Sequence, residues 1–155
     1  MHELGRRLGA VLRAGDLVVL SGPLGAGKTT LVQGIGAGMA VRGPVTSPTF
    51  VIARVHPALA GGPGLVHVDA YRLGSVAEVD DLDLDASLDD CVTVVEWGEG
   101  LVEGLAADRL DISIEMSPAG ADRDWRTVGM TGIGQRWESV AESVRCGLRV
   151  TPKAI

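Results

Sequence analysis

The spacing of apolar side chains along the chain switches between two periods, and the switches predict an alternation of helices and strands. Apolar residues recur at helical spacing at Leu4, Leu8, Val11 and Leu12, which predicts an amphipathic helix over residues 2–13. Short runs of mainly apolar residues predict instead strands that are buried on both faces. Three such runs stand at Leu17–Leu20, Leu65–Val68 and Val92–Val95.

The remaining elements follow from the same patterns. In chain order they are a helix over 29–39, a strand over 50–56, one or two short helices within 75–90, strands over 109–115 and 125–130, and a helix over 135–146. The turn Pro118-Ala119-Gly120 would join the last two strands as a hairpin. This order predicts a three-layer α/β fold with a mainly parallel sheet and an antiparallel hairpin at one edge. No internal repeat is evident, so we expect one domain over residues 1–155.

Composition narrows the classes of protein that the chain can belong to. A length of 155 residues with 46% hydrophobic residues suits one domain with its own core and excludes a disordered chain. The net charge of −6 argues against a broad direct nucleic-acid surface, which needs a basic face. Cys91 and Cys146 lack the spacing of a zinc site. No apolar run is long enough to cross a bilayer, so we expect a cytoplasmic protein without a membrane partner.

A phosphate-binding motif follows the first buried run. The segment Gly22-Pro23-Leu24-Gly25-Ala26-Gly27-Lys28-Thr29 fits G-x-x-x-x-G-K-[ST] between a predicted strand and a predicted helix. Glycines let successive backbone N–H groups approach an anion, and the helix N-terminus adds positive potential. Lys28 would reach the β- and γ-phosphates, and Thr29 would offer its hydroxyl to Mg²⁺. The motif in this setting predicts a P-loop NTPase fold that binds ATP·Mg²⁺.

Two carboxylates stand at the ends of the other buried runs. Asp69 follows the second run and Glu96 the third. Carboxyl ends of parallel strands meet at one sheet edge, so both acids are expected beside the glycine loop, where one of them would hold Mg²⁺. The competing reading is that each acid only caps the next helix.

Four further residues leave alternatives open. Ser47 and Thr49 would either form a switch loop that closes on Mg²⁺ and the γ-phosphate, or belong to a Ser-Pro turn. His67 is interpreted as a strand histidine in preference to a catalytic base. Trp97 is either a core anchor or an aromatic face near the nucleotide or a partner.

In this order the motifs resemble the TsaE family, the P-loop ATPases that assist bacterial biosynthesis of tRNA threonylcarbamoyladenosine. The most specific pieces are Ser47-Pro48-Thr49-Phe50 and Asp69-Ala70-Tyr71-Arg72-Leu73, because the P-loop alone identifies only a superfamily. The resemblance extends over nearly the whole chain and includes Val95-Glu96-Trp97. Family members usually carry a segment before the first helix, whereas here Met1 stands almost at the helix start.

The resemblance implies a set of site residues. Nucleotide-binding residues would be Gly25, Ala26, Gly27, Lys28, Thr29, Thr30, Asp69 and Trp97, metal ligands Thr29 and Glu96, and catalytic residues Lys28, Thr49, Asp69 and Glu96. Asp69 would stand near the phosphates or the attacking water, and Thr49 in a switch-like segment.

The resemblance also implies partners and a role. The partners would be TsaD, which makes the modification, and TsaB, and ATP hydrolysis would reset their complex in the t6A37 modification of tRNA. A small-molecule kinase is the alternative, with Arg123 and Arg126 as the only candidates for a lid over the phosphates. A nucleotide-gated binding module is a third reading. A GTPase is disfavoured because the sequence has no Asn-Lys-x-Asp motif.

Overall fold

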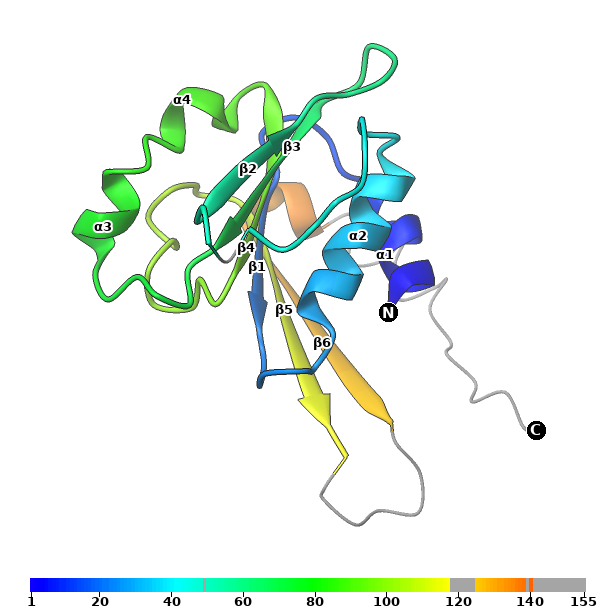
Figure 1. The fold of residues 1–155 in the computed structure, drawn as a ribbon, viewed down its shortest axis with the longest axis vertical. Coiled ribbons are helices and arrows are strands. Elements are labelled where there is room, and N and C mark those ends of the chain that lie inside the picture. The colour runs from blue at the N-terminus through cyan, green and yellow to red at the C-terminus, as the bar shows by residue number, and fades with distance from the viewer. Residues whose placement is uncertain (49, 118–124, 139, 141–155) are drawn as a thin grey trace.

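A six-stranded sheet with strand order β2-β3-β4-β1-β5-β6 organises the computed structural model (Figure 1). The structure describes residues 1–48, 50–117, 125–138 and 140. The strands are β1 Leu17–Ser21, β2 Ala53–His56, β3 Gly64–Asp69, β4 Cys91–Glu96, β5 Arg109–Met116 and β6 Arg126–Ile133.

The four inner strands, β3, β4, β1 and β5, are parallel to one another. Strand β6 pairs antiparallel with β5, which confirms the predicted edge hairpin, although its turn lies outside the described residues. Strand β2 also pairs antiparallel, with β3, so both edges of the sheet are antiparallel. The sequence predicted only the first of these edges, but the mainly parallel α/β fold is confirmed.

Helices cover both faces of the sheet. Helices α1 (His2–Gly9) and α2 (Lys28–Gly38) lie on one face, and α3 (Val76–Asp80) and α4 (Asp85–Leu88) lie toward the other (Figure 1). The strands supply two separate apolar clusters, because successive side chains point to opposite faces. Thus Val18 packs in the cluster under α2, whereas Val19 packs in the opposite cluster. This division assigns each strand residue to a face.

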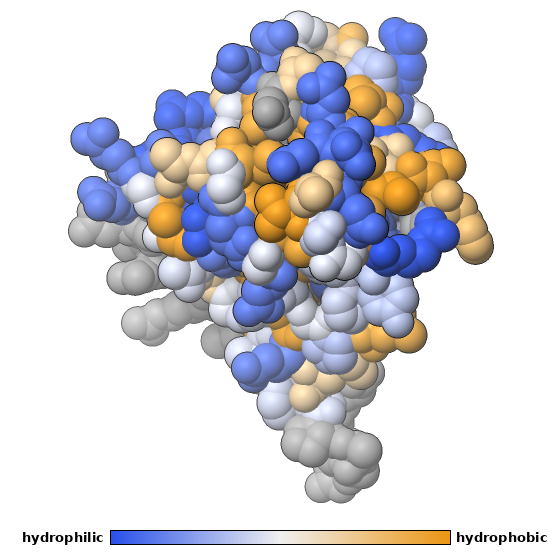
Figure 2. All heavy atoms as spheres, turned by 90° about the vertical axis from the view of Figure 1, so that its left-hand side faces the viewer, coloured by the Kyte–Doolittle hydropathy of each residue, from blue (hydrophilic) through white to orange (hydrophobic). Residues whose placement is uncertain are grey.

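The outer surface mixes polar and apolar side chains. Viewed from the side of α3 and α4, small groups of apolar residues alternate with hydrophilic ones (Figure 2). Within the described ranges, no helix combines the length and the apolar character that crossing a membrane requires.

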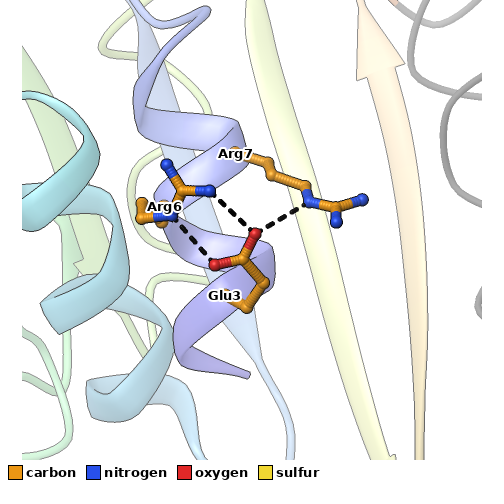
Figure 3. Close-up of polar contacts among 3 residues, drawn as sticks. All are labelled: Glu3, Arg6 and Arg7. Atoms are coloured by element: carbon orange, nitrogen blue, oxygen red, sulfur yellow. Dashed lines mark hydrogen bonds and ion pairs between the residues drawn. The ribbon is translucent and has the colours of Figure 1, made fainter. Parts of the chain in front are cut away.

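The exposed side of α1 carries a compact ion cluster (Figure 3). The Glu3 carboxylate accepts hydrogen bonds from Arg6 Nε at 2.9 Å and from Arg7 Nε at 3.0 Å. The bonds from Arg6, and then those from Arg7, lower the pKa of Glu3 to about 2. More than half of each side chain is exposed, so this cluster contributes little to stability.

The inner side of α1 packs directly against the backbone of α2. A Cβ atom added at Gly34 would lie 2.1 Å from the carbonyl oxygen of His2, and one at Gly5 would lie 2.2 Å from that of Leu31. Such distances leave no room for any side chain, so glycine sets how closely the two helices approach. Because α2 begins at the glycine loop, this contact also supports the element that carries the loop.

Three predicted boundaries were wrong by three residues or more. Helix α1 ends at Gly9 and not at residue 13, and the N–H groups of Val11 and Leu12 bond to the Leu8 carbonyl in the turn that follows. Strand β6 ends at Ile133 and not at residue 130. Strand β2 begins at Ala53 and not at residue 50. In the predicted helix over 135–146, residues 135–138 are helical, and most of the rest lies outside the described part.

The late start of β2 has a local cause. The Pro48 carbonyl accepts hydrogen bonds from the backbone N–H groups of Val51 and Ile52, which closes a turn. Ile52 has a φ of 67°, a left-handed conformation that extended strands do not contain. The chain therefore enters the sheet only after this residue.

We expect Gly34→Ala to destabilise the fold by about 2 kcal/mol, because overpacking against a backbone atom forces the helices apart. Helix propensity alone would make the alanine variant more stable by about 1 kcal/mol. A lower free energy of unfolding in Gly34→Ala would therefore come from packing and not from propensity. Urea unfolding measures it. Gly62→Ala is the control, because a Cβ there meets nothing within 4 Å. Equal unfolding midpoints for wild type and Gly34→Ala would contradict the account.

Candidate functional site

The loop between β1 and α2 has the backbone shape of an anion-binding cradle. Gly22, Gly25 and Gly27 have φ values of 134°, 79° and 102°, in the region that favours glycine. Helix α2 begins at Lys28 directly after the Gly27 cap, with no side-chain cap and no acid in its first turn. The first N–H groups of a helix have no partner inside it. The loop and this helix end together therefore form a site for an anion such as a phosphate.

The Lys28 ammonium lies inside this cradle. Its Nζ donates hydrogen bonds to the carbonyl oxygens of Gly22 at 2.7 Å and Pro23 at 3.0 Å. The same atom stands 3.6 Å from the centre of the Trp97 ring, a cation–π distance. Burial lowers the pKa of Lys28, and the charges of Glu96 and Asp69 oppose that shift. A phosphate group would have to replace the two carbonyl oxygens as the acceptor.

Both predicted carboxylates lie at the sheet edge that carries the loop. Asp69 is the register partner of Glu96, and Glu96 is the partner of Leu20 near the end of β1. Leu20 packs in the cluster under α2, so all three side chains are on the face that α2 covers. Asp69 is 7% exposed and Glu96 is 3% exposed. The sheet therefore brings two buried acids to the start of α2.

Glu96 makes a direct contact with the P-loop. The Thr29 hydroxyl donates to Glu96 Oε1 at 2.8 Å, and lies 3.0 Å from Oε2. This bond leaves the lone pairs of the Thr29 oxygen available to a cation. The pair does not cap a following helix, so the competing interpretation of Glu96 is wrong.

A hydroxyl and a carboxylate are a suitable donor set for Mg²⁺, which prefers oxygen ligands and takes few of them from the protein. Among the residues that the structure describes, no group of three or more His, Cys, Asp or Glu side chains is arranged to hold a metal. The observed pair therefore fits an ion whose other ligands are phosphate oxygens and water. It does not fit a metal held by protein side chains alone.

Asp69 contacts the turn that follows β3. Its Oδ1 accepts a hydrogen bond from the Tyr71 backbone N–H at 3.1 Å. Such a bond is typical of an aspartate that stabilises a turn. The next helix, α3, has Ser75 as its N-cap, so the competing interpretation of Asp69 as a helix cap is not supported either. The carboxylate nevertheless stays beside Glu96 in the register, and its charge acts on Lys28.

The segment around Pro48 forms the turn that the sequence left as one alternative. Ser47 is exposed before it, and Phe50 follows it with 92% of its surface exposed. Thr49 lies outside the described residues, so its place in a switch-like segment stays a prediction.

Trp97 joins the site through its ring and its backbone. Its φ is 63°, a conformation that is rare for a bulky residue. The ring lies under the Lys28 ammonium and 5.1 Å from the ring of Tyr71. Of the two alternatives left open for Trp97, the geometry favours the position beside the phosphate loop. Thr30, in the first turn of α2, is exposed.

One contact of the site was missed by the sequence analysis. His67 Nε2 lies 2.8 Å from Glu96 Oε1, and the imidazole is fully buried. The available signal was spacing: His67 and Asp69 stand two residues apart in a strand, so they share a face. Predicting the contact with Glu96 also required the register of β3 with β4, which the sequence does not show.

Known proteins resemble the chain in sequence and in fold. Residues 1–124 match the family model described as "Threonylcarbamoyl adenosine biosynthesis protein TsaE". The chain is similar to proteins named tRNA threonylcarbamoyladenosine biosynthesis protein TsaE. The one from Streptomyces coelicolor is 62% identical over 148 residues, 95% of this chain and 100% of that protein. The one from Bacillus subtilis is 36% identical over 136 residues, 87% of this chain and 81% of that protein.

A solved structure is also similar. The crystal structure of Bacillus subtilis YdiB superimposes with a TM-score of 0.70 at 28% sequence identity. The superposition covers 94% of this chain and 87% of that one.

Proposed function

The chain belongs to the TsaE family, which takes part in the biosynthesis of threonylcarbamoyladenosine in tRNA, and from this premise we propose that it is a Mg²⁺-dependent ATPase of that pathway. The observation that carries the proposal is the hydrogen bond from Thr29, in the first turn of α2, to Glu96, at the end of β4. It joins an amide-lined loop to a buried carboxylate, as ATP·Mg²⁺ binding requires.

The proposed binding mode uses groups already in place. The N–H groups of Gly25, Gly27 and the first turn of α2 would receive the β- and γ-phosphates. Lys28 would exchange two carbonyl oxygens for phosphate oxygens without leaving the loop. Trp97 would hold the stem and ammonium of Lys28 in position.

The proposed hydrolysis needs only a positioned water and charge stabilisation. A water oxygen bonds to the γ-phosphorus, the bond to the β–γ bridging oxygen breaks, and the water proton leaves to solvent or to a carboxylate. Thr29 and Glu96 would hold Mg²⁺, which neutralises charge on the phosphate oxygens when bound. Asp69, beside Glu96, would orient the water.

Within the pathway, we infer that ATP binding and hydrolysis act on a complex of TsaB and TsaD in the cytoplasm and reset it between rounds of t6A37 formation. Family membership supports this role. The site would change the state of partners and would not transfer the threonylcarbamoyl group itself.

The kinase alternative receives less support. Arg126 belongs to β6, within the sheet, and its Nη1 donates a hydrogen bond to the Trp125 carbonyl. Arg123 lies outside the described residues. A kinase would transfer the γ-phosphoryl group to a metabolite, which thin-layer analysis of labelled products would detect.

Reconstitution tests the pathway role. Purified TsaB, TsaD, tRNA and a threonylcarbamoyl donor are incubated with and without this protein, and modified nucleoside is counted per TsaD. We expect repeated turnover only with this protein and ATP, and about one round or less when a non-hydrolysable ATP analogue replaces ATP. Equal turnover with and without this protein would contradict the role.

We expect Lys28→Ala to weaken ATP binding by about a hundredfold. An ammonium about 4 Å from a phosphate charge contributes on the order of 4 kcal/mol at an effective dielectric near 20, part of which replaces the existing carbonyl bonds. Calorimetry measures the affinity. Lys28→Met, which keeps an apolar stem against Trp97, separates charge from packing and should lose as much. Near-normal affinity in both variants would remove Lys28 from the site.

We expect Glu96→Gln to keep most of the nucleotide affinity and to lower Mg²⁺-dependent hydrolysis by about a hundredfold. The amide still accepts the Thr29 bond but carries no charge for the metal. Steady-state phosphate release at varied MgCl₂ is the measurement. Glu99→Gln, at an exposed acid three residues further on, is the control. Unchanged hydrolysis in Glu96→Gln would move the metal role to Asp69.

A further inference from the structure

We propose that His67 is a positioning residue for the metal site, holding the Glu96 carboxylate in the orientation that serves Thr29 and Mg²⁺. The proposal rests on the proposed function. It assigns a role to a buried histidine that takes no part in the binding and hydrolysis steps described above.

The contact is specific in geometry. His67 stands in β3 opposite Val94 of β4, so Glu96 is its diagonal neighbour on the same face of the sheet. The ring reaches along this diagonal, and Nε2 lies 2.8 Å from Glu96 Oε1. The His67 side chain is 0% exposed and the Glu96 side chain is 4% exposed, so water does not compete for the bond.

The direction of the bond follows from chemistry. An ionised carboxylate only accepts hydrogen bonds, so Nε2 of His67 carries the hydrogen. Nδ1 is buried and has no hydrogen-bond partner among the described residues, so a second N–H there would be unsatisfied. A ring that carries its hydrogen on Nε2 fits both observations. The histidine is thus a fixed donor aimed at one oxygen.

The hydrogen bond from His67 fixes the orientation in which the Glu96 carboxylate faces a cation. Glu96 Oε1 accepts hydrogen bonds from both His67 and Thr29, at 2.8 Å each. Glu96 Oε2 lies farther from the Thr29 hydroxyl oxygen, at 3.0 Å. A free glutamate side chain loses rotamer freedom when it is ordered. Because β3 already holds the histidine, this ordering precedes metal binding. Outer partners that orient a ligand in this way typically change metal affinity by about 10- to 100-fold when removed.

A second buried histidine provides the comparison. His56, in β2, is 4% exposed, and within the described part of the chain its Nε2 has no hydrogen-bond partner. It therefore has the burial of His67 without the contact to Glu96. If His67 serves only as core packing, the two residues should respond alike to the same substitution.

The test compares His67→Leu, His67→Gln and His56→Leu. The affinity of a non-hydrolysable ATP analogue is measured by calorimetry without metal and with MnCl₂, and bound Mn²⁺ is counted by electron paramagnetic resonance. We expect His67→Leu to keep the metal-free affinity and to bind Mn²⁺ about tenfold more weakly. His67→Gln, whose amide nitrogen reaches about as far as Nε2, should recover most of the loss, and His56→Leu should bind Mn²⁺ as wild type does.

Three outcomes would overturn the inference: wild-type Mn²⁺ affinity in His67→Leu, no recovery in His67→Gln, or an equal loss in His56→Leu. If His67→Leu does not fold, His67→Gln is compared with His67→Asn, whose shorter amide reaches only the position of Nδ1. Equal Mn²⁺ affinity in these two polar variants would also overturn it. Wild-type protein that binds neither nucleotide nor Mn²⁺ would instead contradict the proposed function.

Discussion

The hydrogen bond between Thr29 and Glu96 is the interaction on which the geometry of the site depends. It joins residues 67 positions apart in the sequence, one in the first turn of α2 and one at the carboxyl end of β4. The bond forms because β4 is the parallel neighbour of β1, which places Glu96 beside Leu20 just before the loop begins. Without that register, the glycine loop would have no carboxylate beside it.

The packing of the rest of the fold holds the junction between the start of α2 and the end of β4, where Thr29 bonds to Glu96. Backbone-to-backbone contact at Gly34 fixes α2 against α1, and α2 in turn directs its N-terminus at the loop. The apolar cluster under α2 contains Val18, Leu20 and Val94, which alternate with residues of the opposite cluster along the same strands. A one-residue slip of β4 would turn Glu96 toward the wrong face. The register of β4 therefore determines both the packing of the two apolar clusters and the position of Glu96 in the site.

Sequence reasoning reached the parts that local rules determine. The glycine loop, the buried strands and the two strand-end acids each follow from a pattern of a few residues, and the structure brings them together at one edge. The same reasoning missed the start of β2, because the left-handed conformation of Ile52 has no sequence signature. It missed the contact of His67 with Glu96 because a diagonal pair depends on the strand order. Local sequence patterns predict the helices and strands. The contact of His67 with Glu96 depends on which strands pair, which local patterns do not determine.

The central claim is that this junction binds a triphosphate and its metal, and a crystal structure grown with a non-hydrolysable ATP analogue and MgCl₂ tests it most directly. The account predicts phosphate oxygens on the N–H groups of Gly25 to Thr29, Lys28 Nζ moved from the Gly22 carbonyl to a phosphate, and Glu96 facing the metal. An empty loop, or a Glu96 carboxylate turned away from bound nucleotide, would contradict it.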